Sequence, residues 1–235
     1  AQGHGGSAGL GELVLVDPGG ATTDVHSVAD GRPSREGVIA QGLPEPRVKR
    51  TVEGDLGMRH NAAAIADAAG LDALAADSGL PAARIAASIA ALATDVARIP
   101  ASPDELALDR ALARAAIRLA VKRHAGTVET VFTVTGPVAV QHGKDLGDVA
   151  VLIGTGGAIA HAAQPATILQ AALADPTDPL SLRPRAPRLM LDRSYIVYAC
   201  GLLAQVEPQA ALELGLKHLV ELAAQEEVRD GAVRA

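Results

Sequence analysis

Positions 13 to 24 hold the side chains of this sequence that are best suited to bind a charged ligand. An apolar run ends at a carboxylate, and a turn with two glycines, two threonines and a second carboxylate follows: Asp17, Gly19, Gly20, Thr22, Thr23 and Asp24. Glycines let backbone N–H groups approach phosphate oxygens closely, because no Cβ intervenes. Threonine hydroxyls donate hydrogen bonds, and a carboxylate at a strand end can hold Mg²⁺ through its waters. The pattern indicates a site for a metal-bound polyphosphate, and the alternative is a plain Gly-Gly hairpin.

A second glycine-rich turn follows another apolar run much later in the sequence. The run 148–153 leads into Gly154, Thr155, Gly156 and Gly157. By itself this turn could be a simple strand-to-helix connection, and it lacks the third glycine of a dinucleotide fingerprint. No phosphate loop of the G-x-x-x-x-G-K-S/T type occurs either. Because ligands of α/β sheets bind where strands end and loops open a crevice, we expect the two turns to lie on one groove.

The composition restricts the classes of protein to which the chain can belong. With 235 residues, it is one large domain or a compact domain with an insert. The net charge of -6 argues against a nucleic-acid surface, and no apolar run reaches the length of a membrane span. The single cysteine, Cys200, fits a reducing cytoplasm and lies in an apolar helical pattern, so we expect an inert core thiol. The histidines show no close metal-ligand spacing, so a zinc site is not expected.

The elements that must position the first turn are strands followed by helices. We expect a hairpin over 11–29 and a strand over 37–40. Thr51 is expected to cap a short helix over 52–58. Residues 61–98 are alanine-rich and predicted helical, with a break near 77–80. The clearest helix start is 102–105, which has the spacing of a capping box with proline at the first helical position.

The second half of the sequence returns to strands and then to helices. Runs on either side of Gly136-Pro137 predict a second hairpin. The runs 148–153 and 189–191 predict further strands, and the turn at 154–157 is expected to lead into a helix. Two more helices are expected, one from residue 194 and one from residue 208 to residue 225.

Other charged residues have two interpretations each. Three acids are possible cleft residues: Asp24, Glu53 and Asp55. Acids in a first helical turn are, however, also favoured by the helix dipole alone. Lys49 and Arg50 could reach phosphate or form a solvated basic pair. Asp192 and Arg193 form a local ion pair or a helix cap.

The two glycine turns resemble motifs of the actin, Hsp70 and sugar-kinase ATPase superfamily. Residues 17–24 resemble its second phosphate motif, and residues 154–157 resemble its adenosine motif. More narrowly, four runs in the chain are similar to the MutL family associated with glutamate mutase, which is unrelated to the mismatch-repair protein of that name: 19–25, 49–59, 143–146 and 191–193. The resemblance extends in order over residues 12–200.

This resemblance implies a fold and a domain organisation. The fold class is an α/β, actin-like (ribonuclease H-like) ATPase domain with a mixed five-stranded sheet, flanking helices, an inserted helical segment and an extra β-hairpin. Residues 12–225 would be the second domain of a two-domain ATPase, with the helical insert over 60–125. Residues 1–11 would be a flexible linker, and residues 226–235 a frayed tail.

The resemblance also assigns roles to residues and implies the cofactors ATP and Mg²⁺. Asp17 matches the catalytic acid that holds Mg²⁺ through water. The β- and γ-phosphates would be held by Gly19, Gly20, Thr22 and Thr23. The adenosine would lie on Gly154, Thr155, Gly156 and Gly157. Pro18 departs from the motif, and it removes one N–H donor from the loop.

The function implied by the resemblance is that of an ATP-dependent reactivator or chaperone. Its target would be a cytoplasmic adenosylcobalamin-dependent mutase of the glutamate mutase or aminomutase type. The expected partners are the mutase subunit, which the helical insert would contact, and the first ATPase domain, but no nucleic acid or membrane. Because hydrolysis in this superfamily occurs between two domains, we expect ATPase activity of the longer protein and weak nucleotide binding at best by this chain. A small-molecule kinase and a bacterial actin-like structural protein are the alternatives.

Overall fold

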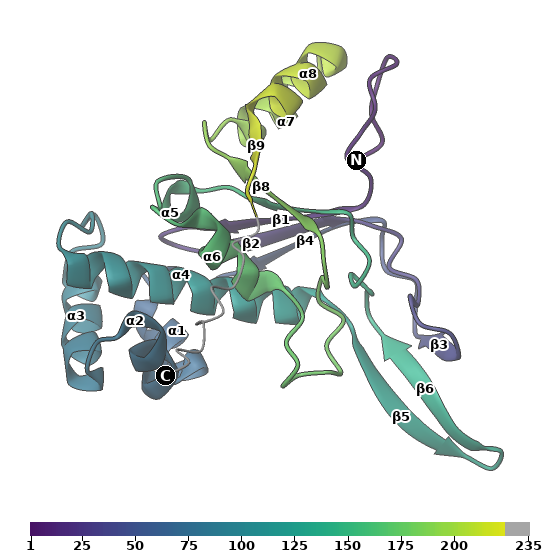
Figure 1. Ribbon diagram of the computed structural model, residues 1–235, viewed down its shortest axis with the longest axis horizontal. Helices are drawn as coiled ribbons and strands as arrows, with labels where there is room; N and C mark the ends of the chain where they lie inside the picture. The colour runs from purple at the N-terminus through teal and green to yellow at the C-terminus, as the bar shows by residue number, and fades with distance from the viewer. Residues whose placement is uncertain (224–235) are drawn as a thin grey trace, which may run out of the picture.

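The computed structural model describes residues 1–223, which form a six-stranded sheet with flanking helices and a separate three-stranded sheet (Figure 1). The larger sheet has the strand order β4-β2-β1-β7-β8-β9, with the bounds β1 Leu13–Pro18, β2 Thr23–Val28, β4 Val48–Glu53, β7 Val151–Gly154, β8 Arg188–Asp192 and β9 Leu219–Glu221. Strands β1, β7 and β8 are parallel, whereas β2 and β9 run antiparallel to their neighbours. The fold is therefore α/β with a mixed sheet, as predicted. The predicted number of five strands is wrong, because β9 adds a sixth.

One face of the larger sheet forms the main core. Side chains alternate along β1 and β2, so that Val14, Val16 and Val25 point to the same face, where all three are fully buried. The helices α5 (Gly157–Ala160) and α6 (Pro165–Leu169) lie over this face beside a longer helix, α4. The opposite face carries a smaller cluster of buried residues that the N-terminal segment partly covers.

Helix α4 (Pro103–His124) begins as the sequence predicts. The Ser102 hydroxyl accepts from the Glu105 N–H, and the Glu105 carboxylate accepts from the Ser102 N–H, which completes a capping box. The helix packs against β1 and β2 through its buried stripe and ends at His124, just before Gly126. One long helix therefore supports the β1–β2 hairpin from the core side.

Three shorter helices precede α4: α1 (Ala62–Ala69), α2 (Leu71–Ser78) and α3 (Ala82–Thr94). With α4 they occupy the stretch 60–125, whose role as an insert stays a prediction; from here on, the helical insert means α1–α3. Helices α1 and α2 pack against α4, and α3 packs against α1 and α2. The predicted break near 77–80 is confirmed, since Gly79 ends α2 with a φ of 73°. A second break at Gly70 was not predicted, because one glycine in an alanine-rich run is compatible with a continuous helix.

The predicted helix over 52–58 is wrong. Residues Val48–Glu53 form strand β4, which pairs with the whole length of β2, from Val28 opposite Val48 to Thr23 opposite Glu53. Thr51 caps no helix, and its hydroxyl instead makes a hydrogen bond to the His124 ring (2.9 Å). Two glycines in this segment weaken any helix there, so pairing with β2 decides the conformation.

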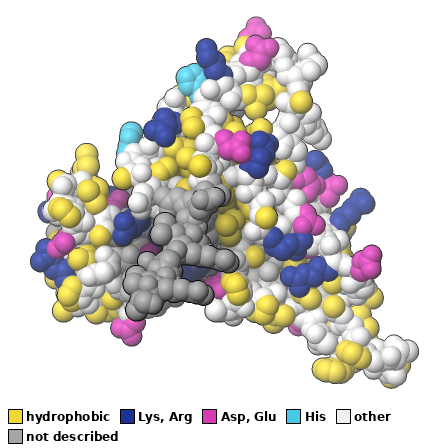
Figure 2. Space-filling view, in the orientation of Figure 1, with side chains coloured by type: hydrophobic (Ala, Val, Ile, Leu, Met, Phe, Trp, Pro, Cys, Tyr) yellow, Lys and Arg dark blue, Asp and Glu magenta, His cyan; other side chains and the backbone are white. Residues whose placement is uncertain are grey.

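The smaller sheet contains the predicted second hairpin and has the order β3-β6-β5: β3 Val38–Gln41, β5 Thr127–Thr133 and β6 Gly136–His142. Strand β3, predicted over 37–40, pairs in parallel with β6 rather than with the first hairpin. The hairpin of β5 and β6 projects from the body (Figure 1). Apolar side chains lie at its outer end, at the lower right of Figure 2, where Phe132 is 83% exposed.

The remaining helices are the 3₁₀ helix η1 (Gln170–Ala172), which follows α6, and the C-terminal helices α7 (Val197–Leu203) and α8 (Pro208–His218). Helices after residues 194 and 208 are confirmed, but α8 ends at His218 because residues 219–221 pair with the edge of β8. Residue 225 and the predicted tail 226–235 lie outside the described residues. A flexible linker over 1–11 stays a prediction. Within residues 1–223, no helix combines the length and the apolar character that crossing a bilayer requires.

A fully buried lysine joins the two sheets. The Lys144 ammonium donates to Ser27 Oγ (3.1 Å), to the Pro46 carbonyl (2.9 Å) and to the Arg47 carbonyl (2.8 Å). No carboxylate is among these partners, and burial lowers the pKa of Lys144. Three acceptors thus replace the water that the ammonium loses.

A buried histidine lies beside this lysine. The His124 ring contacts Ser27 Oγ through Nε2 (2.8 Å) and Thr51 Oγ1 through Nδ1 (2.9 Å). Burial, together with the positive charges of Lys49 and Lys144, lowers the pKa of His124 to about 3. The imidazole is therefore neutral in the folded protein at ordinary pH.

Candidate functional site

The two glycine turns meet at one edge of the larger sheet. Strands β1 and β7 are neighbours, Val16 is opposite Gly154, and the Thr155 N–H donates to the Val16 carbonyl (3.0 Å). Gly156 lies so close to β1 that a Cβ on it would overlap Asp17 Oδ1. Its φ of 89° also favours glycine. The prediction that the two turns lie on one groove is confirmed.

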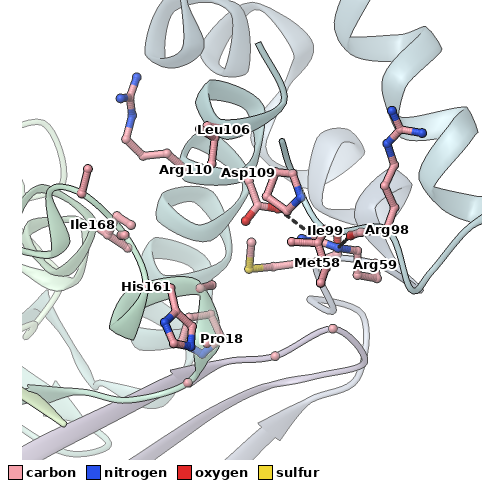
Figure 3. Close-up of a pocket in the computed structure, with 18 of the residues that line it drawn as sticks. Pro18, Met58, Arg59, Arg98, Ile99, Leu106, Asp109, Arg110, His161 and Ile168 are labelled. Carbon is pink, nitrogen blue, oxygen red and sulfur yellow. Dashed lines mark hydrogen bonds and ion pairs between the residues drawn. The ribbon is translucent and has the colours of Figure 1, made fainter. Parts of the chain in front are cut away.

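A groove of about 1000 Å³ opens over these turns (Figure 3). Residues 17–20 and 156–158 line it from the sheet side, together with Tyr195. The opposite wall comes from the connection between α3 and α4 and from the first turns of α4. Charged and aromatic groups on this wall and at the ends include Arg59, Arg98, Asp109, Arg110 and His161. The groove is large enough for a nucleotide-sized ligand.

Asp17 is the carboxylate that faces the groove at the end of β1. Burial raises its pKa, and the nearby carboxylates of Asp24 and Asp192 raise it further. Asp24 is neutralised by Arg50, whose Nε and Nη2 donate to its Oδ1 (2.9 and 2.7 Å). Asp17 has no such cation in contact among the described residues. A cation at the end of β1 would therefore relieve the repulsion and favour the ionised form.

The first glycine turn, residues 17–24, contains residues that line the groove and residues that hold the turn. Gly19 and Gly20 line the groove. The Gly19 N–H donates to the Thr22 carbonyl (2.8 Å), and the Thr22 hydroxyl donates to Asp24 Oδ2 (2.9 Å). The Thr23 hydroxyl is fully buried and donates to the Leu56 carbonyl (2.7 Å). The structure thus places Gly19 and Gly20 in the groove, but not the two threonine hydroxyls.

The second turn divides in the same way. Gly156 and Gly157 line the groove. Gly154 faces the core instead, where a Cβ would collide with the Leu169 side chain. The Thr155 hydroxyl donates to the fully buried Asp192 (2.9 Å), which also accepts the Ile196 and Val197 N–H groups at the start of α7. Asp192 is therefore a helix cap, one of its two predicted roles.

The remaining candidates lie away from the groove. Glu53 and Asp55 both bind Arg123 at the end of α4, at 2.8 and 2.7 Å, and the Arg123 contact lowers the pKa of Asp55. The explanation of these two acids by a helix dipole is wrong, because no helix begins there. Lys49 pairs with Glu45 (3.1 Å) rather than with a phosphate site. Cys200 is buried in α7, and burial raises the pKa of its thiol, in agreement with a core thiol.

Comparison with known proteins identifies the family. A family model described as MutL protein matches residues 2–219. The chain belongs to the MutL family. One relative, the Protein MutL of Clostridium tetanomorphum, is 41% identical over 225 residues, which is 94% of this chain. The chain covers 48% of the length of that relative, about half. The resemblance seen in the four sequence runs is thus confirmed.

Four groove residues of this MutL-family chain were not singled out from the sequence. Arg59 lies in one of the family-like runs, but nothing local distinguishes it from a surface arginine. Asp109 and Arg110 lie on α4, where charged residues between apolar positions usually indicate a solvent-exposed helix face. Tyr195 offers one conformational signal, a φ of 51°, which only the structure reveals. These residues reach the groove through tertiary packing.

Proposed function

We propose that this chain binds Mg²⁺-ATP in the groove and is one half of an ATP-driven reactivator of an adenosylcobalamin-dependent mutase. The nucleotide part rests on a single observation, which is the convergence of Asp17, Gly20 and Gly156 on one groove. The mutase part rests on membership of the MutL family. Since the chain covers 48% of its relative, the activity belongs to the longer protein.

The groove residues fit a magnesium-bound triphosphate. Asp17 would hold Mg²⁺ through water, and the cation would offset the neighbouring carboxylates that raise the Asp17 pKa. Within residues 1–223, the Gly20 N–H has no acceptor, so it is available to a phosphate oxygen. Gly156 leaves the space beside Asp17 open because it has no Cβ. When bound, the metal neutralises charge on the phosphates during their hydrolysis.

The actin-like fold is part of this proposal. Its support is the run of five strands β4-β2-β1-β7-β8, in which only β2 is antiparallel, with the ligand turns at the ends of β1 and β7. The groove is open to solvent between its two walls, as expected for a domain whose partner domain would close over it. Nucleotide-dependent closure of the two domains would then transmit the state of the site to the mutase.

A binding experiment tests the nucleotide part directly. We expect Mg²⁺-ATP to bind this chain weakly in calorimetry, and we expect Asp17→Asn to reduce the affinity at least tenfold. The matched control is Asp55→Asn, which removes a carboxylate that lies outside the groove and should leave the affinity unchanged. Equal affinities for all three proteins, or no binding by the unmodified chain, would contradict the assignment of the groove.

A second experiment tests the mutase part with the longer protein. ATP hydrolysis should rise when an adenosylcobalamin-dependent mutase carrying a damaged cofactor is added. Phosphate transfer to a small molecule would indicate the kinase alternative, and sedimentation with ATP would indicate a filament. Either of these results, without stimulation of ATP hydrolysis by the mutase, would refute the proposal that the longer protein is a reactivator.

A further inference from the structure

We propose that Arg59 is a positioning residue that couples the first glycine turn (residues 17–24) to the helical insert. We further propose that Asp109 competes with a bound phosphate for the guanidinium of Arg59. This inference rests on the proposed function, because it names the regulation of the same groove. It goes beyond that function by assigning the group that responds to occupancy and the segment that moves.

The backbone around Arg59 supports the first glycine turn. The Met58 N–H donates to the Gly19 carbonyl (3.0 Å), and the Arg59 and His60 N–H groups both donate to the Gly20 carbonyl (2.9 and 3.0 Å). The side chain of Arg59 passes beside Gly20, where a Cβ would lie 3.5 Å from Arg59 Cγ. A shift of Gly19 and Gly20 would therefore displace Arg59 directly.

The guanidinium of Arg59 contacts the opposite wall of the groove. Its Nη1 lies 2.6 Å from Asp109 Oδ1 on α4, and its Nε donates to the Arg98 carbonyl (3.2 Å) (Figure 3). The side chains of Arg59 and Asp109 are only 15% and 17% exposed. The contact is thus shielded from solvent, which strengthens it compared with a surface ion pair.

The Arg98 carbonyl belongs to the segment 95–101, which returns the helical insert to α4. The Arg98 side chain binds Glu105, whose carboxylate also accepts the Ala101 and Ser102 N–H groups at the start of α4. A continuous chain of contacts therefore runs from Gly20 through Arg59 to the segment 95–101. This segment is short, largely exposed and free of regular structure, so it can adopt a second arrangement more readily than α3 or α4.

A phosphate group bound at Gly20 would change the balance of these contacts. It would add negative charge on the same groove as the guanidinium, where Asp109 is the present counter-ion. Movement of Arg59 toward the phosphate would loosen its contacts with Asp109 and with the Arg98 carbonyl. The insert would then have a nucleotide-dependent position, which is the differential contact that a switch requires.

The competition predicts opposite effects of two substitutions on the affinity for Mg²⁺-ATP and for Mg²⁺-triphosphate. Arg59→Met should weaken binding of both ligands about tenfold, because a charge-assisted contact is lost. Arg59→Lys should recover part of this loss. Asp109→Asn should strengthen binding at least threefold, because the competing carboxylate is gone. A purely structural ion pair predicts instead that Arg59→Met and Asp109→Asn weaken binding alike.

The matched control is the ion pair of Arg84 on α3 with Asp104 on α4, at 2.8 Å, which likewise ends on α4 but lies outside the groove and is largely exposed. Arg84→Met and Asp104→Asn should leave both affinities unchanged. Circular dichroism confirms that each variant is folded before its affinity is interpreted.

Hydrogen exchange provides the second readout. Mg²⁺-ATP should increase exchange of the amides in 95–101 at least threefold in the unmodified chain, and not in Arg59→Met at saturating nucleotide. Binding without this change, or equal effects of the two groove substitutions, overturns the inference and leaves the proposed function intact. Absence of binding by the unmodified chain removes both.

Discussion

Replacement of Gly156 by alanine should damage the groove and the fold together. Gly156 has φ 89° and ψ 151°, a region that is essentially restricted to glycine and costs other residues about 1–3 kcal/mol. The added Cβ would also overlap Asp17 Oδ1 and lie 3.3 Å from the Pro18 carbonyl oxygen. Displacing that carboxylate adds to the cost, so we expect Gly156→Ala to lose about 2–4 kcal/mol of stability. Urea unfolding should show a midpoint lower by about 1 M, with weaker binding of Mg²⁺-ATP.

The neighbouring glycine provides the control. An added Cβ on Gly157 would meet no atom closer than His161 Cδ2, at 3.9 Å, and the backbone there is open to other residues. Gly157→Ala should therefore stay within about 0.5 kcal/mol of the unmodified chain. If the two variants have the same urea midpoint and the same affinity for Mg²⁺-ATP, the close approach of the two turns is refuted as the reason for glycine at position 156.

Three further predictions concern buried charge. Asp17→Asn should raise the free energy of unfolding at pH 7, because the raised pKa of Asp17 means that its ionisation costs stability as the pH rises; the gain should vanish at pH 3 in urea unfolding. Lys144→Met should cost about 2–3 kcal/mol by leaving three acceptors unpaired, whereas Lys122→Met, which removes an exposed charge, should cost under about 1 kcal/mol in the same assay. The pKa of His124 is about 3 when folded, below its unfolded value of 6.5. Stability should therefore fall by on the order of 1.4 kcal/mol per pH unit as the pH drops from 6.5 toward 4, and His124→Gln should lessen that slope; identical slopes would refute the neutral buried imidazole.

The parts of the fold that the sequence predicts are those decided by local patterns. Alternating side chains and bounding glycines predict the first hairpin, and the capping box at Ser102 predicts the start of α4. The segments 48–53 and 219–221 were not predicted as strands, because their conformation depends on pairing with β2 and β8. Such pairing involves residues far away in the sequence, so a local pattern of charged and β-branched residues carries no signal for it.

The candidate site shows the same division. The glycine turns were predicted to meet because each follows an apolar strand, and the neighbouring positions of β1 and β7 bring them together. The roles of Thr22 and Thr23 could not be read from the motif, since their hydroxyls bind Asp24 and the Leu56 carbonyl. Arg59 and Asp109 meet only after the helical insert has folded back on α4. Their partnership is a property of tertiary packing.

The adjacency of β1 and β7 has a consequence for how MutL proteins can diversify. The helices of residues 62–94 and the projecting hairpin of residues 127–142 both lie between β4 and β7 in the chain, one before α4 and one after it. The register of Val16 with Gly154 depends on the pairing of β1 with β7, so either segment can be longer or shorter without changing it. Relatives should accordingly differ in length within these two segments, whereas the number of residues between the end of β1 or β7 and its glycine turn should be constant.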